Sequence, residues 1–214
     1  MDQSRVAIVI PAYNEAATIF DIVSSTSSYG QPIVVNDSSM DTTAQRAEQA
    51  GAIVVTHKSN MGYDGALNTG FAEAYSRGFD TIITLDADGQ HDPSLLIRFI
   101  QEIENGADLV LGVRNRRPRL AEHIFALYTR VKYGIQDPLC GMKAYRRTVY
   151  ESLGYFDSYK SIGTELALYG IKKKYKFSQI HFVVKDRIDQ PRFGRLISAN
   201  IRIFRAMILD LCRL

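Results

Sequence analysis

The amino-acid sequence predicts an α/β fold in which helices flank a mostly parallel β-sheet. Two observations support this. Short apolar runs rich in β-branched residues alternate with longer helix-like segments through the first half of the chain, and polar residues cluster directly after several of these runs. Alternation of strands and helices is typical of βαβ units, which build parallel sheets. With 214 residues, 46% of them hydrophobic, the chain is expected to bury one substantial core.

Strands and helices are expected to alternate through the first 113 residues. The expected strands are 6–10, 33–35, 53–56, 81–85 and 108–113, and the expected helices are 16–27, 42–50, 65–77 and 93–104. Asp92 before Pro93 is a typical helix start, because aspartate caps free amides and proline is tolerated at the first helical position. Gly51, Gly78 and Gly106 follow three of the helices, where left-handed C-caps are common.

The pattern loosens from residue 114 onward. Helices are expected at 120–133 and 164–174, and a strand at 179–185. In the last segment, 195–214, apolar residues recur at helical spacing with arginines among them, which predicts an amphipathic helix. We therefore expect one domain, 1–194, followed by this helix. Within the domain, the break in pattern separates a first half, 1–113, from a second half, 114–194.

Charge is divided unevenly between the two parts of the chain. Residues 1–113 hold 5 Lys and Arg against 15 Asp and Glu, whereas residues 114–214 hold 21 against 8. An acidic half suits metal coordination, and a basic half suits a polyanionic ligand or an anionic membrane surface. Two solvated surfaces that neutralise each other are the alternative explanation. The basic residues are not interleaved with a recognisable nucleic-acid-binding motif, so nucleic acid is not an expected partner.

The sequence also predicts a location. The first residues lack the pattern of a signal peptide, and the chain contains no run of about 18 uninterrupted apolar residues. Cys140 and Cys212 lie far apart without CxxC spacing, so neither a disulfide framework nor a structural zinc site is expected. These features favour a cytoplasmic protein without a transmembrane helix.

Polar residues follow four of the expected strands, in the segments 11–15, 36–39, 60–62 and 86–90. In an open α/β sheet, ligands bind outside the carboxyl ends of the strands. The sequence therefore predicts that these four segments meet at one edge of the sheet and form the ligand site.

Asp86 and Asp88 are the strongest candidates for chemistry. Side chains of extended backbone alternate faces with period two, so two carboxylates one residue apart point the same way. Like charges this close require a neutralising cation or proton, and hard oxygen ligands suit Mg²⁺ or Mn²⁺. Gln90, two residues on, adds a neutral oxygen ligand on the same side. The alternative is a loop in which Asp86 caps a turn and Asp88 is solvated.

Four motifs in this order resemble family 2 glycosyltransferases, whose GT-A fold is Rossmann-like. They are Ile10-Pro11-Ala12-Tyr13-Asn14-Glu15, Val34-Val35-Asn36-Asp37-Ser38-Ser39-Met40-Asp41, the loop 60–70, and Leu85-Asp86-Ala87-Asp88-Gly89-Gln90-His91. The resemblance covers residues 6 to about 196. It is closest to the dolichol-phosphate mannosyltransferase branch, which includes bacterial polyprenyl-phosphate sugar transferases.

The resemblance implies a GDP- or UDP-sugar donor and a Mg²⁺ or Mn²⁺ ion. It also implies that the first half of the domain, 1–113, binds the nucleotide sugar and the second half, 114–194, the acceptor. It assigns nucleotide-sugar binding to Pro11, Tyr13, Glu15, Val35, Asp37, Asp86, Ala87, Arg114, Arg187 and Arg192. It assigns the metal to Asp86, Asp88 and Gln90, and catalysis to Asp88, Arg114 and Glu165. Asp37 is expected to accept a hydrogen bond from the base. The arginines are expected near phosphates, because guanidinium groups pair bidentately with phosphate oxygens, with a solvated surface charge as the alternative role.

The chain also departs from the family pattern. Asn36 stands where aspartate is usual and Ser38 where glycine is usual. Tyr63 and Asp64 replace a basic residue and a glycine, and Cys140 replaces a serine or threonine. The departures at 36, 38, 63 and 64 leave the nucleotide and the sugar open, and Cys140 leaves open the acceptor role that the resemblance implies for the segment 137–143.

Two acceptors remain open as well. A polyprenyl phosphate supplies an oxygen that is already anionic, whereas a hydroxyl acceptor requires a carboxylate to take its proton. Glu165 is the candidate base, and a carboxylate that stabilises a helix N-terminus is its alternative role. Only one acid stands there, where relatives that transfer to hydroxyls often carry two.

The sequence therefore predicts metal-dependent, inverting transfer of a sugar to a polyprenyl phosphate or a related lipid-linked acceptor. The basic, amphipathic last helix favours an enzyme that is peripheral on the inner face of an anionic membrane, although a core-packing helix has the same pattern. Transfer to a saccharide hydroxyl in cell-surface polysaccharide synthesis is one alternative. A non-catalytic nucleotide-sugar-binding subunit of a membrane complex is another.

Overall fold

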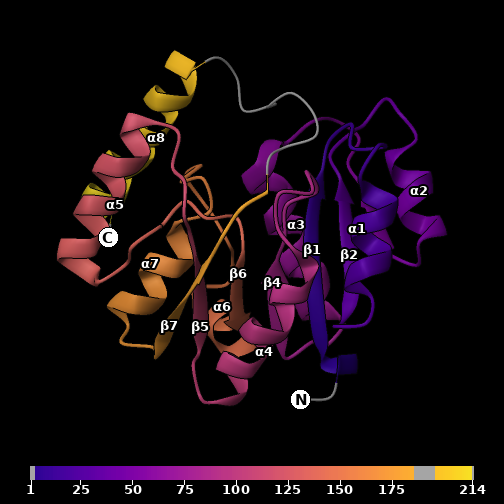
Figure 1. Cartoon of the computed structure of the whole chain (residues 1–214), viewed down its shortest axis with the longest axis horizontal. Coiled ribbons are helices and arrows are strands. Elements are labelled where there is room, and N and C mark those ends of the chain that lie inside the picture. Colours follow the sequence, from indigo (N-terminus) through magenta and orange to yellow (C-terminus); the bar gives the residue numbers. More distant parts are fainter. Residues whose placement is uncertain (1–2, 186–195, 214) are drawn as a thin grey trace.

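A seven-stranded sheet forms the centre of the computed structural model, which describes residues 3–185 and 196–213 (Figure 1). The strands lie in the order β3-β2-β1-β4-β6-β5-β7. Their bounds are β1 Val6–Ala12, β2 Gln31–Asn36, β3 Ile53–Thr56, β4 Thr81–Thr84, β5 Leu109–Arg114, β6 Lys143–Arg146 and β7 Phe177–Phe182. β6 runs antiparallel to both of its neighbours, and every other pairing is parallel. The predicted α/β class with a mostly parallel sheet is confirmed.

Helices cover both faces of this sheet. They are α1 Ile19–Thr26, α2 Thr43–Gln49, α3 Gly62–Ser76, α4 Leu96–Glu104, α5 Leu120–Tyr133, α6 Arg147–Leu153, α7 Glu165–Lys172 and α8 Leu196–Arg213, with short 3-10 helices at Gln3–Arg5 and Pro93–Leu95. Asp92 caps the second of these as expected, because its carboxylate accepts a hydrogen bond from the Ser94 backbone amide. None of the described helices is long and apolar enough to cross a membrane.

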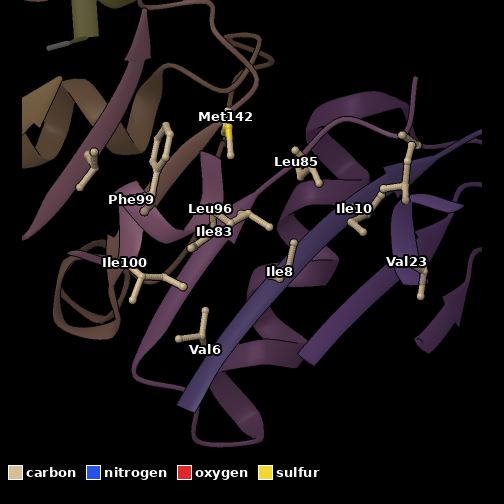
Figure 2. Packing of buried hydrophobic residues seen from close by; sticks show 14 of the residues in the cluster. Val6, Ile8, Ile10, Val23, Ile83, Leu85, Leu96, Phe99, Ile100 and Met142 are labelled. Atoms are coloured by element: carbon tan, nitrogen blue, oxygen red, sulfur yellow. The ribbon is translucent and has the colours of Figure 1, made fainter. Parts of the chain in front are cut away.

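The core is divided by the sheet into two layers. Along β1, Val6, Ile8 and Ile10 pack towards α1 and α4 (Figure 2). Ala7 and Val9 pack on the other face, towards α3. This alternation is the period-two pattern of a strand that is buried on both faces. The layer on the α3 side also includes residues of α6 and α7.

The sequence prediction missed β6 and the helix α6 that follows it. β6 spans only Lys143–Arg146, and its two charged ends do not follow a strand's apolar pattern. The structure accommodates those charges through carbonyl partners. The Lys143 ammonium donates to the Gly163 carbonyl at 2.7 Å, and the Arg146 Nε donates to the Ala107 carbonyl at 3.0 Å. The expected strand at 179–185 forms slightly earlier in the chain, as β7.

Helix α8 packs on α5 through a third apolar cluster, which is built on Ala121, Phe125, Ile203 and Ala206. Asn200 of α8 also accepts a hydrogen bond from the Ala121 amide at 3.2 Å. The expected C-terminal helix is therefore present, and its buried face rests on α5. The division of the chain at residue 194 remains a prediction.

Candidate active site

A cavity of about 930 Å³ lies at the carboxyl ends of the central strands. Each of the four predicted polar segments contributes to its wall. The lining residues from the first half include Pro11, Ala12, Tyr13, Glu15, Asp37, Asn60, Met61, Gly62, Asp86, Ala87 and Asp88. Convergence of these segments follows from the parallel sheet, which brings the ends of β1, β2 and β4 to one edge.

Asp86 and Asp88 both line this cavity, just beyond the end of β4. Asp86 Oδ1 accepts a hydrogen bond from the Tyr63 hydroxyl at 3.2 Å, and Asp88 Oδ1 accepts one from the Gln90 amide at 3.1 Å. The Asp86 carboxylate also contributes to raising the pKa of the buried Tyr63 hydroxyl, although desolvation is the larger cause. Tyr63 therefore stays protonated and donates its hydrogen bond to Asp86.

Gly141 makes room for the Asp86 carboxylate. A Cβ atom added at Gly141 would lie 2.0 Å from Asp86 Oδ2, well inside van der Waals contact. Any larger residue there has to displace the carboxylate or the backbone. Gly141 is thus a site residue that the sequence reasoning did not select, although it stands in the segment that departs from the family pattern at Cys140.

His91 is a second residue that the sequence reasoning did not select. Its ring is buried against Phe182, with ring centroids 5.5 Å apart, and its Nδ1 lies 4.0 Å from Asp86 Oδ2. Within the described part of the chain, this Nδ1 has no hydrogen-bond partner. His91 therefore packs beside the Asp86 carboxylate without a hydrogen bond to it.

Gln90 lies outside the lining of the cavity. Its backbone carbonyl accepts a hydrogen bond from the Lys185 amide at 2.9 Å, and its side-chain amide donates to the Lys185 carbonyl at 3.4 Å. Gln90 therefore ties the segment after β4 to the segment after β7. Its role as a metal ligand remains a prediction.

Six acidic residues line the cavity, and among them Asp86 and Asp88 stand one residue apart just beyond β4, where they can share a divalent metal. The described residues contain no cluster of three or more His, Cys, Asp and Glu side chains suited to hold an ion. Mg²⁺, however, is usually bound through one or two carboxylates together with substrate phosphates, rather than by a complete protein cage. Asp86 and Asp88 fit a metal that arrives with a diphosphate.

Asp37 is buried at the end of β2 and anchors the loop that leads into α3. Its Oδ1 accepts a hydrogen bond from the Met61 amide at 2.7 Å, and its Oδ2 accepts one from the Gly62 amide at 2.8 Å. His57 Nδ1 lies 2.7 Å from the same Oδ1. Asp37 lines the cavity, but these contacts show that it also fixes the position of the cavity wall.

The other predicted nucleotide-sugar residues of the first half divide into two groups. Pro11, Tyr13, Glu15 and Ala87 line the cavity. Tyr13 is 39% exposed, so its ring is available to a ligand. Val35 is fully buried in β2, where its side chain faces Gly70 of α3. Its side chain packs in the core, so only its backbone remains available for the predicted role.

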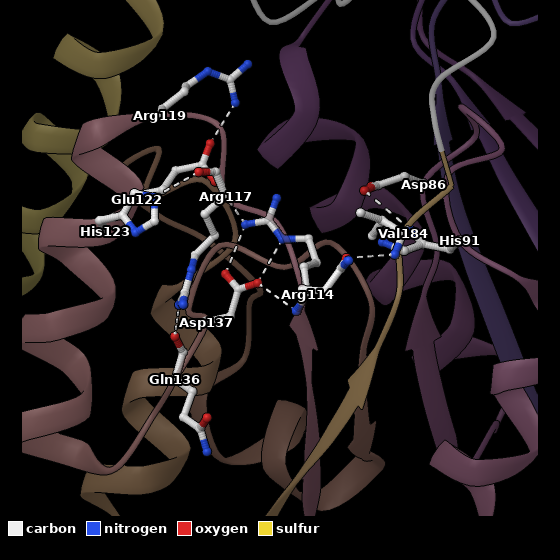
Figure 3. A network of polar contacts seen from close by, with 11 residues as sticks. Asp86, His91, Arg114, Arg117, Arg119, Glu122, His123, Gln136, Asp137 and Val184 are labelled. Carbon is white, nitrogen blue, oxygen red and sulfur yellow. Dashed lines mark hydrogen bonds and ion pairs between the residues drawn. The ribbon is translucent and has the colours of Figure 1, made fainter.

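Arg114 lies at the end of β5 in a buried network of ion pairs (Figure 3). Its guanidinium forms a bidentate pair with Asp137, at 2.8 and 2.9 Å, and contacts Glu122 at 3.2 Å. Arg119 contacts the other oxygen of Glu122 at 2.8 Å. Burial lowers the pKa of Arg114, but the hydrogen bonds and charge of Asp137 outweigh this effect and raise it.

This network joins β5, α5 and the turn that follows α5. Arg114 is not among the residues that line the cavity, and its Nε and Nη2 atoms are engaged by the carboxylates of Asp137 and Glu122. The geometry assigns Arg114 to holding β5, α5 and the turn after α5 together. Its predicted contact with phosphate remains untested.

Glu165 begins α7 and is buried outside the cavity lining. Both of its carboxylate oxygens accept hydrogen bonds from Ser158: one from the backbone amide, the other from the hydroxyl at 2.9 Å. Desolvation raises its pKa, against the lowering effect of these hydrogen bonds. The alternative role at a helix N-terminus agrees with this geometry. The two other predicted residues, Arg187 and Arg192, lie outside the described residues.

The fold and the cavity define a class: an α/β enzyme of the glycosyltransferase type, with paired carboxylates at the carboxyl edge of its sheet. The model of the family Glycosyl transferase family 2 matches residues 7–154. The chain therefore belongs to glycosyl transferase family 2, as the motifs indicated.

Curated relatives are named for transfer to polyprenyl phosphates. The chain is 28% identical to UDP-N-acetylglucosamine--dolichyl-phosphate N-acetylglucosaminyltransferase of Methanococcus voltae, over 72% of this chain and 74% of the relative. It is 32% identical to undecaprenyl-phosphate 4-deoxy-4-formamido-L-arabinose transferase of Pseudomonas fluorescens, over 69% and 48%. It is 33% identical to polyprenol monophosphomannose synthase of Mycolicibacterium smegmatis, over 70% and 64%. The chain thus spans between about half and three quarters of these relatives.

Solved structures confirm the fold. Glucosyl-3-phosphoglycerate synthase from Mycobacterium tuberculosis, in complex with Mn²⁺, uridine diphosphate and phosphoglyceric acid, aligns with a TM-score of 0.78 at 22% identity. The alignment covers 98% of this chain and 78% of that one. The GT-A fold that the motifs implied is therefore the fold of this protein.

Proposed function

We propose that this protein transfers a sugar from a nucleoside diphosphate sugar to a polyprenyl phosphate or a related lipid-linked acceptor, with inversion at the anomeric carbon. One observation carries the proposal. A single cavity is lined both by the carboxylate pair Asp86 and Asp88 and by cationic side chains of the second half. The cavity thus offers a metal-assisted site for one phosphate group and a basic site for another.

The donor half of the proposal rests on Asp86 and Asp88. These carboxylates hold a Mg²⁺ or Mn²⁺ ion, which, when bound, stabilises the charge that develops on the leaving diphosphate. Tyr63 and Gly141 keep Asp86 in place, and Asp37 fixes the loop at the start of α3. The nucleoside is then accommodated by Pro11, Tyr13 and Glu15, which form the neighbouring wall.

The choice of a phosphate acceptor rests on the hydrogen bonds that Glu165 makes. Its two oxygens are occupied by Ser158, so it is poorly placed to remove a proton from a hydroxyl. A phosphate oxygen needs no base because it is anionic at neutral pH. The protein then only has to position that oxygen for in-line attack on the face opposite the leaving diphosphate, which inverts the anomeric carbon.

The names of relatives support the same assignment. The M. voltae, P. fluorescens and M. smegmatis proteins are named for dolichyl-phosphate, undecaprenyl-phosphate and polyprenol acceptors. The mycobacterial structure pairs uridine diphosphate with Mn²⁺. We infer a UDP- or GDP-sugar donor for this chain.

An apolar stripe on α5 favours a peripheral position on a membrane. Leu120, Leu127 and Val131 are 70%, 63% and 81% exposed, and Ile124 completes the i, i+4, i+7, i+11 spacing of one helix face. Basic residues stand beside the stripe at Arg130 and Lys132, in the last turn of α5. A helix face of this kind inserts into the headgroup region of an anionic bilayer, as on the inner face of a cell membrane.

The proposal is tested by incubating the full chain with labelled UDP- and GDP-sugars, Mn²⁺, and either undecaprenyl phosphate in detergent or a free saccharide. We expect label in the lipid phosphate only, and loss of transfer on adding a chelator. Transfer to the saccharide alone would replace the proposal with the hydroxyl-acceptor reaction. Donor binding without transfer to either acceptor would favour a non-catalytic subunit.

A further inference from the structure

The cavity has a cationic wall that the sequence did not reveal. Among the described lining residues, the basic ones are Lys160 from the loop 157–164 and Arg202 and Arg205 from α8. Arg202 and Arg205 are three residues apart in a helix, so they lie on the same face. They stand 42 or more positions beyond Lys160 in the chain, and only the tertiary fold brings the three together.

The loop that carries Lys160 is rigidly held. Asp157 Oδ1 accepts hydrogen bonds from the Tyr159 amide at 3.1 Å and the Lys160 amide at 2.6 Å. Lys160 and Ile162 both have φ near +60°, a left-handed conformation that is unfavourable for side chains of this size. Backbone strain that a surrounding network enforces is typical of ligand-binding segments.

Helix α8 is fastened to the same loop. Asp210, 1% exposed, accepts hydrogen bonds from the Tyr159 hydroxyl at 2.5 Å and from the Thr164 hydroxyl at 2.8 Å. Arg205 Nη1 donates to the Tyr159 carbonyl at 3.3 Å. This Asp210 latch fixes the distance between α8 and the loop, so the three cations keep one arrangement at the cavity.

The charges on the rest of the cavity wall indicate which ligand the three cations attract. The acidic lining residues are Glu15, Asp37, Asp64, Asp86, Asp88 and Asp157. A diphosphate enters the acidic part only together with a metal ion. A second phosphate that binds without a metal needs cationic side chains beside it. Arginine suits this role because it pairs bidentately with phosphate oxygens.

We propose that Lys160, Arg202 and Arg205 form a subsite for the phosphate monoester of the acceptor. The inference rests on the proposed function and specifies where its second substrate binds. The shared chemistry is a terminal phosphate dianion, whether it heads a polyprenyl chain or belongs to a soluble phosphate monoester. The subsite holds this group while the donor diphosphate occupies the carboxylate side.

A double variant of the full chain, Arg202→Gln with Arg205→Gln, tests the subsite by binding. The probe is a short-chain prenyl phosphate, titrated calorimetrically into protein saturated with Mn²⁺ and UDP or GDP. We expect its Kd to rise about thirtyfold to a hundredfold, which corresponds to about 2 to 2.7 kcal/mol. The affinity for the nucleotide should stay within about twofold. Lys172→Gln with Lys173→Gln on α7 removes the same charge outside the cavity and should change neither value.

Unchanged phosphate affinity in the arginine variant, with an unchanged melting temperature, would overturn the subsite. An equal loss of nucleotide affinity would also overturn it, because the arginines would then belong to the donor site. The binding test does not depend on turnover. If the wild type fails to transfer sugar, the proposed function is rejected, but the subsite is still tested by this titration.

A second arm identifies the source of the phosphate. Transfer is compared with undecaprenyl phosphate in detergent and with 3-phosphoglycerate in solution, for wild type and for Lys160→Gln. We expect the KM for the substrate that is used to rise about tenfold in Lys160→Gln while kcat stays within about threefold. A fall in kcat at unchanged KM for both substrates would contradict a binding role for Lys160.

Discussion

The two sides of the cavity are built in different ways. The donor side consists of loops that follow β1, β2 and β4, and the parallel sheet brings them together at one edge. The acceptor side consists of the loop 157–164 and α8, which are joined by the buried Asp210 latch. The donor side therefore depends on strand order, whereas the acceptor side depends on a few specific contacts between distant segments. Substitutions should separate the two sides cleanly.

Neutralising the carboxylate pair should have the largest effect and act on the donor side. We expect Asp86→Asn with Asp88→Asn to lower kcat about a thousandfold, because stabilisation of the leaving diphosphate is lost. Transfer assays with Mn²⁺ and a nucleotide sugar measure this. Asp21→Asn on the exposed face of α1 is the control and should retain wild-type turnover. Full activity in the double variant would remove the metal from the mechanism.

Gly141→Ala tests whether Asp86 needs its present position. The added methyl group lies where the Asp86 carboxylate now sits, so we expect about a hundredfold loss of activity and weaker Mn²⁺ binding. Gly170→Ala in α7 is the matched control, because its new Cβ meets only side-chain carbons at 3.3 Å or beyond. Equal activity of the two variants would show that Asp86 tolerates displacement.

These donor-side residues were largely accessible to sequence reasoning. Asp86 and Asp88 were selected because period two and the strand pattern place them together, and the cavity contains both. Gly141 and His91 were not selected, because their importance comes from contact with Asp86 rather than from any local pattern. Gln90 was selected by spacing; its side-chain amide donates to the Lys185 carbonyl, and its role as a metal ligand stays a prediction.

The rest of the site was much harder to predict from the sequence. Arg114 was expected near phosphates, yet Asp137 and Glu122, which lie 23 and 8 positions away, surround its guanidinium. The cationic pair of α8 was seen only as part of an amphipathic pattern. Its position at the cavity follows from Asp210, whose partner Tyr159 is 51 residues away. Contacts over such separations leave no periodic signal in one sequence.

Substitutions in the apolar stripe of α5 should affect membrane binding without affecting the donor side. Leu127→Ser with Val131→Ser removes two exposed side chains from the face of α5. We expect partition onto vesicles of anionic lipid to fall about a hundredfold, because two large apolar side chains are removed and each contributes about 1.5 kcal/mol on burial. Sedimentation with vesicles measures this. Nucleotide binding should be unchanged, and unaltered sedimentation would reject α5 as the contact surface.

Loosening the latch should have a smaller effect that is confined to the acceptor side. Tyr159→Phe removes the hydroxyl that donates to Asp210 and leaves the ring in place. We expect the acceptor KM to rise about fivefold to tenfold, since a hydrogen bond to a charged group contributes about 1.5 kcal/mol or more. Nucleotide affinity should remain at the wild-type value. Tyr169→Phe, which removes a hydroxyl bonded to the Ser152 carbonyl outside the cavity, is the control.

The last prediction concerns the effect of pH on the stability of the fold. Desolvation raises the pKa of Asp64 from 3.8 to about 7. The folded protein therefore holds this proton where the unfolded chain has released it. The free energy of unfolding should fall as the pH rises from about 4 to about 7 and then level off. In Asp64→Asn the decline should be shallower, so the difference in melting temperature between wild type and variant should change by about 10 °C from one end of this range to the other. Parallel melting curves for the two proteins would contradict the assigned ionisation.

The central claim is that Asp86 and Asp88 hold a divalent metal together with the donor diphosphate. Electron paramagnetic resonance of Mn²⁺ tests this directly, because bound Mn²⁺ loses the sharp signal of the free ion. We predict that the wild type immobilises Mn²⁺ tightly only when UDP or GDP is present, and that the Asp86→Asn, Asp88→Asn variant leaves the ion free under the same conditions. Equal immobilisation by wild type and variant would contradict the account.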